Sequence, residues 1–276
     1  MFYFLPRELK HATGMLVVAL ATTAAPQAKA TAVSGQGTWE TTLQSRDLDG
    51  DLSNGPEAFF DAVLNVTWLA DANFARTSGY TSAANGGVPR GSEFGTNVIW
   101  TDGSMGWDAA NTWAANLNVN GLTGWRLPTM VDTGPLGCNR AFSGTDCGYN
   151  VSTSTSELAH MYQVTLRNLA YYDPSGNGPQ SGWGLTNTGP FSNLQSSRYW
   201  YGVAYTPPAN DPWSINDAWI FLSENGHQLD SEKANGFYAW AVRSGDVATA
   251  VPEPQTYALA LAGLAVAVRA AKRRKR

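Results

Sequence analysis

Cysteine, histidine and lysine are scarce in this chain. Its 276 residues include two cysteines and three histidines, the side chains on which many metal centres and nucleophilic enzymes depend. The sequence has no phosphate-binding loop, dinucleotide fingerprint, nucleophile elbow or H-E-x-x-H motif. It also has no internal repeat that we can detect. These absences disfavour the common nucleotide-binding proteins, hydrolases and zinc proteases.

Positive charge is almost missing from the middle of the chain. Residues 31–251 hold nine Lys and Arg, of which only Lys233 is a lysine, against twenty Asp and Glu, a formal charge of −11. A domain this acidic repels phosphates, so we expect no nucleic-acid partner. The same acidity suits divalent cations, and calcium is the cofactor that we consider.

No apolar run is long enough to span a bilayer, but two short ones lie near the ends. At the N-terminus, Arg7 and Lys10 precede the apolar run 15–25, and residues 28–30 read Ala-Lys-Ala. A basic region, an apolar region and an A-x-A site make a secretory signal peptide. We therefore expect residues 1–30 to direct export through the Sec translocon and to be removed after Ala30.

The other run, residues 257–268, covers roughly 18 Å of a hydrocarbon core of about 30 Å. It stands between a Pro-Glu-Pro tripeptide and a basic end, which the positive-inside rule holds in the cytoplasm. The residues of this pattern are Pro252, Glu253, Pro254, Arg269, Arg273 and Arg274.

This order of three parts resembles the PEP-CTERM sorting tail of bacterial exported proteins. The resemblance implies that a membrane exosortase cuts the chain near Pro-Glu-Pro. The protein would then be an inner-membrane protein only transiently, through the tail 249–276, and would act at the cell surface or in the extracellular matrix. The alternative is an ordinary C-terminal membrane anchor.

The two cysteines, Cys138 and Cys147, are close in sequence. In an oxidising compartment such a pair is expected to form a disulfide. A metal-binding or catalytic thiol is the alternative.

An acidic turn, D-L-D-G-D, places Asp47, Asp49 and Asp51 at the spacing that opens a calcium loop. The pattern then departs from an EF-hand, because Leu52 and Ala58 stand where Gly and Glu are required. The turn is thus either a solvated acidic turn or a calcium site of another kind.

Hydrophobic periodicity predicts two helices and several short strands. Residues 31–58 read as a polar, extended lead-in. The predicted strands are 62–69, 198–205, 218–222 and 237–242, the predicted helices are 106–118 and 155–169, and a hairpin is predicted to turn at 225–226.

Short motifs occur in this order along the body of the chain. They are Thr67-Trp68-Leu69, Leu117-Asn118, Gly124-Trp125-Arg126-Leu127-Pro128-Thr129, Tyr199-Trp200, Ala218-Trp219 and Val242-Arg243. The set resembles the Lcl C-terminal-like domain, of the superfamily that joins C-type-lectin-like and formylglycine-generating-enzyme-like folds. The resemblance implies an α+β, C-type-lectin-like domain over residues 59–248, with two helices and short, loop-rich antiparallel strands.

The family's functional residues match only in part. We expect Arg126 to tie loop carbonyls or a carboxylate together, with ligand binding as the alternative. Trp213, Asn216 and Asp217 form an incomplete version of a lectin's Trp-Asn-Asp motif. The catalytic cysteine pair of the formylglycine-generating enzymes comes late in their fold and has no counterpart, so the resemblance does not carry that activity over.

These observations favour an exported, non-enzymatic surface or matrix protein that binds or organises exopolysaccharide in a biofilm. An exported enzyme built on the formylglycine-generating scaffold is the alternative. The histidines His160 and His227 and the aromatic pairs Tyr199-Trp200 and Tyr238-Trp240 are expected to be structural.

Overall fold

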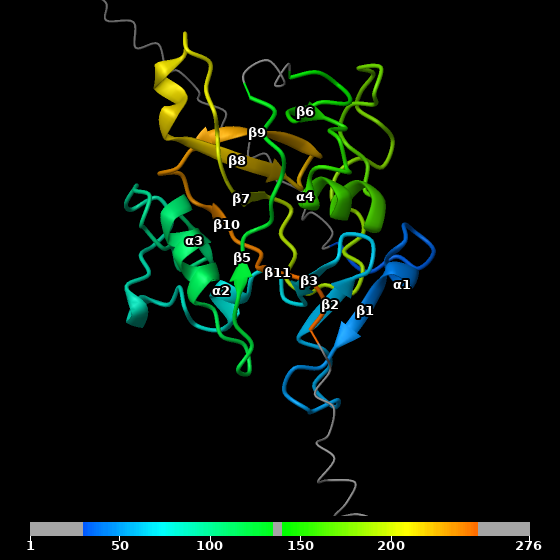
Figure 1. Ribbon diagram of the computed structural model, residues 1–276, viewed down its shortest axis with the longest axis vertical. Helices are drawn as coiled ribbons and strands as arrows, with labels where there is room; N and C mark the ends of the chain where they lie inside the picture. The colour runs from blue at the N-terminus through cyan, green and yellow to red at the C-terminus, as the bar shows by residue number, and fades with distance from the viewer. Residues whose placement is uncertain (1–29, 135–139, 248–276) are drawn as a thin grey trace, which may run out of the picture.

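Two β-sheets built from short strands organise the fold (Figure 1). The computed structural model describes residues 30–134 and 140–247. Strands outweigh helices there, and long loops join them, so the predicted α+β class is confirmed.

The first sheet has five strands and brings the two ends of the described chain together. In pairing order they are β1 (Leu43–Arg46), β2 (Ala58–Asp61), β3 (Val66–Leu69), β11 (Val242–Ser244) and β5 (Trp125–Arg126). Every pairing in it is antiparallel. The second sheet has six strands: β4 (Ser104–Met105), β10 (Phe237–Tyr238), β7 (Arg198–Ala204), β8 (Asp217–Leu222), β9 (His227–Glu232) and β6 (Gly148–Tyr149). Only β10 and β7 pair in parallel among these strands.

The helices are short except for one. They are α1 (Trp39–Thr42), α2 (Phe74–Thr77), α3 (Trp107–Asn116) and α4 (Glu157–His160), with 3-10 turns at Ala83–Asn85 and Pro212–Asn216 and a π-helical turn at Met161–Thr165. The helix predicted over 106–118 is α3. It buries Ala110, Trp113 and Ala114 on one face, as the three- and four-residue spacing requires, and carries Asp108 in its first turn.

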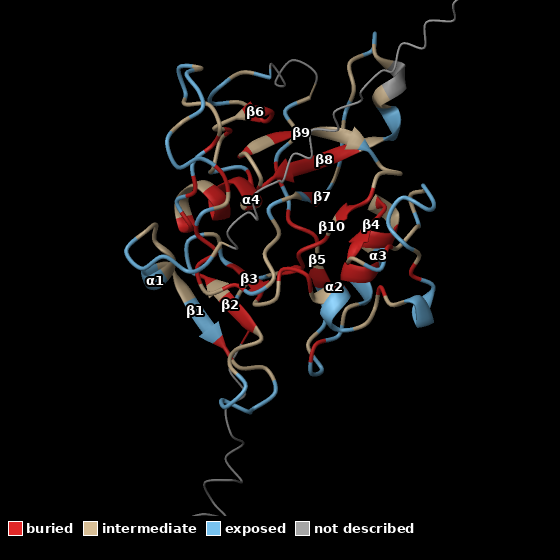
Figure 2. Cartoon of the chain, turned by 180° about the vertical axis from the view of Figure 1, so that it is seen from behind, coloured by how far each residue is buried: buried red, intermediate tan, exposed pale blue. Residues whose placement is uncertain are grey.

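Tryptophan side chains make up much of the buried interior, and Figure 2 shows the buried residues of both sheets in red. Trp68, Trp100, Trp200, Trp219 and Trp240 are all fully buried. Each ring covers a large apolar area, which compensates for the small amount of regular structure. The indole N–H of Trp240 donates to the Leu69 carbonyl at 2.8 Å, and that of Trp200 donates to the Met105 carbonyl at 2.8 Å.

The predicted lead-in belongs to the folded body. Residues 39–46 form α1 and β1, and β1 pairs along its whole length with β2. Arg46 at the end of β1 makes a two-point ion pair with Asp246, with both nitrogen–oxygen distances at 2.7 Å. The domain therefore starts well before residue 59.

The strand predicted over 62–69 is wrong in its first half. Residues 62–65 are a hairpin turn between β2 and β3. Asp61 makes the turn, because its Oδ1 accepts the N–H groups of Val63 and Leu64 at 2.9 and 3.1 Å. Asn65 completes it in the left-handed region, at φ 54°.

The second predicted helix, 155–169, is also shorter than expected. It begins after Ser156, whose hydroxyl accepts the Ala159 N–H, and its π-helical turn ends at Thr165. Arg167 then takes a left-handed φ of 51°, which stops the helix.

The strand predicted over 237–242 divides between the sheets, since β10 joins the second sheet and β11 the first. The strands predicted over 198–205 and 218–222 and the hairpin at 225–226 are confirmed as β7, β8 and the β8–β9 hairpin. No helix within the described parts of the chain has both the length and the apolar character needed to cross a membrane.

Candidate functional site

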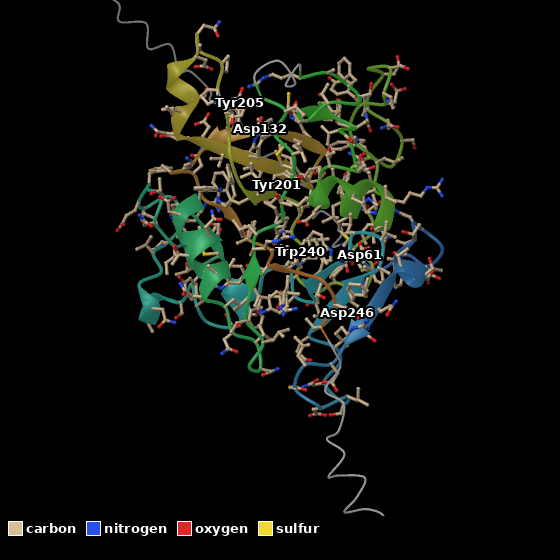
Figure 3. The ribbon with its side chains drawn as sticks, viewed as in Figure 1. Asp61, Asp132, Tyr201, Tyr205, Trp240 and Asp246 are labelled. Carbon is tan, nitrogen blue, oxygen red and sulfur yellow. The ribbon has the colours of Figure 1, made fainter. Side chains whose placement is uncertain are left out.

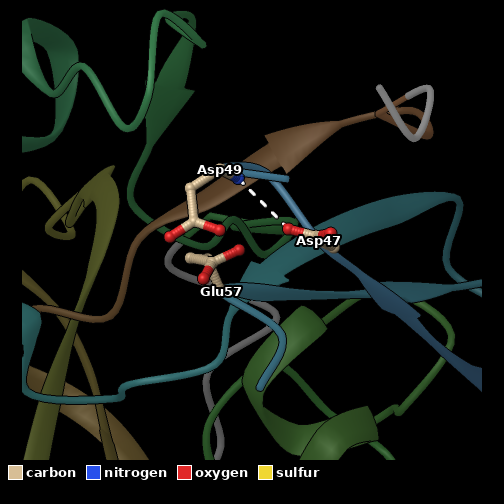
Figure 4. A group of neighbouring side chains, drawn as sticks. All are labelled: Asp47, Asp49 and Glu57. Carbon is tan, nitrogen blue, oxygen red and sulfur yellow. Dashed lines mark hydrogen bonds between the residues drawn. The ribbon is translucent and has the colours of Figure 1, made fainter. Parts of the chain in front are cut away.

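The acidic turn after β1 gathers three carboxylates, but not the predicted three. Asp47, Asp49 and Glu57 each offer an oxygen, and these oxygens lie within 4.8 Å of one another (Figure 4). Glu57 reaches the group from just before β2, and its Oε2 accepts the Leu48 N–H at 2.7 Å. Carboxylate oxygens are the ligands that calcium prefers.

Asp51, the third predicted ligand, is not a member of this carboxylate group and instead forms hydrogen bonds with Ser53. Its Oδ1 accepts the backbone N–H and the hydroxyl of Ser53 at 3.0 and 2.6 Å. Asp49 Oδ1 accepts the Asp51 N–H, and the pKa of Asp49 is lowered by that bond and by the amide of Asn54. Sequence spacing missed Glu57 because it stands one place before the position that an EF-hand uses. The calcium hypothesis stays a prediction, with Glu57 replacing Asp51.

Arg126 in β5 holds a carboxylate, as expected of its structural role. Its Nη1 and Nη2 donate to the two oxygens of Glu157 at 2.8 and 2.7 Å. Glu157, the first residue of α4, also accepts the Thr129 N–H at 2.7 Å. This two-point pair fixes the start of α4 against the turn at Pro128. Because Glu157 occupies the guanidinium, this geometry supports the structural reading of Arg126 over the ligand reading.

The incomplete lectin motif is spread over two elements. Residues 212–216 form a 3-10 turn, in which Asn216 is exposed, and Asp217 opens β8. The side chain of Trp213 lies outside the part that the structure describes. The ligand role of these residues therefore stays a prediction.

Asp217 instead belongs to an acidic surface on the β8–β9 pair. Burial, followed by the neighbouring carboxylates of Asp230, Glu232 and Asp211, raises the pKa of Asp217 to about 6. Asp230 pairs with Arg140 at 2.9 Å. The signal in the sequence was the alternation of β9, which puts Asp230 and Glu232 on the face that Asp217 shares.

Asp132 borders the same surface, where Figure 3 shows it beside Tyr205. Its Oδ2 accepts the indole N–H of Trp219 at 3.0 Å and the Thr206 N–H at 2.9 Å. The Tyr205 ring meets the Trp219 ring edge-on at 5.2 Å. These contacts fix the acidic surface against the core.

The two described histidines are held by structural contacts. His160 is buried, and its Nδ1 lies 3.3 Å from the Thr153 carbonyl. His227 stacks on Tyr149 with ring centres 4.4 Å apart, and burial, aided by Arg140, lowers the pKa of His227 to about 4. The pairs Tyr199-Trp200 and Tyr238-Trp240 pack in the core, as expected, with only Tyr238 partly exposed.

The disulfide prediction involves a residue outside the described part. Cys138 lies there, while Cys147 is buried and its Sγ accepts the Arg140 N–H at 3.1 Å. The pairing of the two cysteines therefore stays a prediction.

The ends of the chain, which carry both predicted signals, also lie outside the described residues. A family model, the PEP-CTERM protein-sorting motif, matches residues 250–275. Comparison with curated proteins and with solved structures gave no match. The predicted sorting tail is thus confirmed: the protein is exported, is a substrate for an exosortase, and is anchored in the membrane only until the tail is cut.

Proposed function

We propose that the protein is a non-enzymatic component of an extracellular polysaccharide matrix, with a binding or structural role at the cell surface. The observation that carries this proposal is the sorting motif at residues 250–275. An exosortase substrate leaves the membrane after cleavage, so its folded body acts outside the cell. A body with a formal charge of −11 stays soluble there and is repelled by nucleic acids.

The order of elements supports a C-type-lectin-like domain of the Lcl C-terminal kind. The early strand β3, the helices α3 and α4, and the late strands β7 to β11 follow one another as that fold requires. The quoted motifs fall on these elements, since Trp68 lies in β3, Arg126 in β5 and Trp219 in β8. This is support by analogy of fold, and the ligand has to be argued from surfaces.

The side chains that could serve in catalysis are better suited to a structural role, which favours a binding protein over an enzyme. Arg126 is occupied by Glu157, and His160 and His227 are engaged with neighbours. Cys138 and Cys147 both precede α4, whereas the rival enzyme scaffold needs its cysteine pair late in the fold. We therefore retain the enzyme only as the alternative.

Fractionation of cells that make the protein tests the proposal. The mature protein should be recovered with the matrix polysaccharide and released when that polysaccharide is digested. Deleting the gene should weaken the matrix, and the full chain should restore it. A mature protein found only in the medium, together with an unaltered matrix in the deletion strain, contradicts the proposal.

A further inference from the structure

Six rings form a continuous run at the β6 side of the second sheet. They belong to Phe142, Tyr149, Tyr171, Tyr172, Trp183 and His227. Tyr172 lies 5.0 Å from Phe142 and 4.7 Å from Tyr171, and Tyr171 lies 4.8 Å from Trp183, measured between ring centres. Phe142 and Trp183 are 40% and 41% exposed, so the run reaches solvent at these two rings.

Glycine backbone supports these rings from one side. A side chain at Gly176 would meet the Phe142 ring at 2.8 Å, and one at Gly178 would meet the Tyr172 ring at 2.7 Å. The turn itself is fixed by Asp173, whose Oδ1 accepts the N–H groups of Ser175 and Asn177. The aromatic surface is therefore held in place before any ligand arrives.

A groove of about 510 Å³ continues the run beyond Trp183. It is lined by Gly35, Gln36, Arg167, Leu169, Gly182 and Thr186. Leu169 pairs with Trp183 through a backbone bridge and is itself 40% exposed, so ring surface and groove share an edge.

The groove carries one cation and has one anion at its rim. Within the described ranges, the Arg167 guanidinium has no hydrogen-bond or ion-pair partner, while Gln36 Nε2 holds its backbone carbonyl at 3.0 Å. Glu40 accepts the Gly35 N–H at 3.0 Å and the Ser34 hydroxyl at 2.7 Å, which places its carboxylate beside the lining residue Gly35. The local charge is close to zero, with strong donors and acceptors.

We propose that this surface, the ring run with its groove, binds an uncharged polysaccharide chain. Sugar rings would lie with their C–H faces on Trp183 and Phe142, and hydroxyls would accept from Arg167 and donate to Glu40. A polyanion is disfavoured because the surrounding domain carries a formal charge of −11 and the Glu40 carboxylate lies beside Gly35, which lines the groove. This inference rests on the proposed matrix role and names its site and its ligand class.

Affinity electrophoresis of the full mature protein tests the site. The gels contain glucomannan or dextran as neutral probes, or alginate as the polyanion. We expect retardation by glucomannan and none by alginate. Trp183→Ala and Arg167→Ala should each weaken binding by about tenfold, in the range of an anchoring side chain. Trp183→Phe should keep part of the binding, and Phe94→Ala, at another highly exposed ring, should leave it unchanged.

The outcomes separate the site from the broader proposal. Retardation that Trp183→Ala and Arg167→Ala leave intact, in variants whose melting temperatures match the wild type, overturns this site but not the matrix role. Binding to alginate alone, or to neither neutral probe, overturns the ligand class. A dimer seen by light scattering that Trp183→Ala dissociates shows that a second copy covers the surface and overturns the proposal. If the wild-type protein itself is absent from the matrix fraction of cells, the proposed function is overturned as well.

Discussion

Burial shifts the pKa values of Asp217 and His227 in opposite directions. The pKa of Asp217 is raised to about 6, by burial first and then by Asp230, while burial lowers the pKa of His227 to about 4. For Asp217 the native state binds the proton more tightly than the unfolded chain, so this contribution to stability is present at low pH and is lost as pH rises towards 6. For His227 the native state resists the proton, so stability rises with pH between about 4 and 6.5. Between about pH 4 and 6 the two groups therefore change the free energy of unfolding in opposite directions.

We therefore expect the two single variants to tilt the wild-type stability profile in opposite directions. Asp217→Asn should melt higher than the wild type at pH 7.5 and show little gain at pH 4.5. After discounting for solvent screening the difference is about 1 kcal/mol, or roughly 2–4 °C. His227→Phe keeps the stack on Tyr149 and should make stability fall as pH rises. Thermal melts at the two pH values measure this, and equal slopes in all three proteins would contradict it.

The Arg126–Glu157 pair gives a prediction about stability. Glu157 is only 12% exposed in its side chain, so removing Arg126 leaves a largely buried carboxylate that keeps the Thr129 N–H but loses both guanidinium donors. Arg126→Met should lower the free energy of unfolding by about 2 kcal/mol, and the double variant with Glu157→Gln should recover part of that loss. Urea titrations measure both.

Arg243→Met is the matched control for that experiment. Arg243 lies on the neighbouring strand β11 and makes one exposed bond to the Thr123 carbonyl, at 2.9 Å. It should cost no more than about 0.5 kcal/mol. Equal losses in the Arg126 and Arg243 variants would mean that the two-point pair contributes nothing particular.

Calcium binding at the acidic turn can be assigned to one of two ligand sets. With a site of about 0.1 mM affinity in about 1 mM calcium, the bound form gains roughly 1.4 kcal/mol. Melts in calcium and in chelator should then differ by about 2–4 °C. Glu57→Gln should abolish the difference, and Asp51→Asn should retain it, because Asp51 is engaged with Ser53. Identical melts of the wild type would leave the turn without a calcium role.

At the scale of elements, sequence patterns succeeded where the structure is locally determined. The apolar spacing predicts α3, and Asn225-Gly226 predicts the turn between β8 and β9, because in both cases neighbouring residues decide the conformation. The β2–β3 hairpin was missed because Ala62, Val63 and Leu64 are apolar, and the turn depends on the flanking residues Asp61 and Asn65.

The elements and site residues that the sequence did not predict correctly depend on contacts between residues far apart in the chain. The second helix ends early because amides from other segments hold its last carbonyls: Gln36 Nε2 and Asn187 Nδ2 both donate to Leu166, at 3.2 and 2.8 Å. No local sequence pattern near residue 166 predicts those contacts. The same holds for the ring surface, whose members come from residues 142 to 227 and meet only in the fold. The chemistry of Arg126 predicted that it ties loop carbonyls or a carboxylate together, but it could not identify Glu157 as the partner.

The loop that contains the cysteines yields a prediction at this scale. Residue 140 contacts the Cys147 sulfur, and Gly148 fits closely against the Ala141 carbonyl, so the chain is already drawn together there. A disulfide between Cys138 and Cys147 would stabilise the mature protein by less than about 3 kcal/mol, since the loop is short. Intact-mass analysis after alkylation without reductant should find no free thiol. Two alkylated thiols in freshly purified protein would show that the cysteines are unpaired.

For the whole molecule, charge is divided between the body and the sorting tail. The body has a formal charge of −11, whereas the chain as a whole has −4, because the terminal segments carry half of the basic residues. Removing both signals therefore leaves a more acidic protein than the one that is synthesised. The anionic body favours water over the membrane once the tail is cut, while the cationic end orients the uncut chain with its basic residues at the cytoplasmic face.

Replacement of Pro252, Glu253 and Pro254 by alanine should stop release. The apolar run 257–268 and the basic end would still insert and orient the chain, but the exosortase would lack its recognition motif. We expect the variant to stay in the membrane fraction with its tail intact by mass, whereas Thr249→Ala, just outside the matched motif, should be released normally. Release of both variants with the same new C-terminus would show that cleavage does not read Pro-Glu-Pro. Retention of the wild type in the membrane would mean that the tail acts as a lasting anchor.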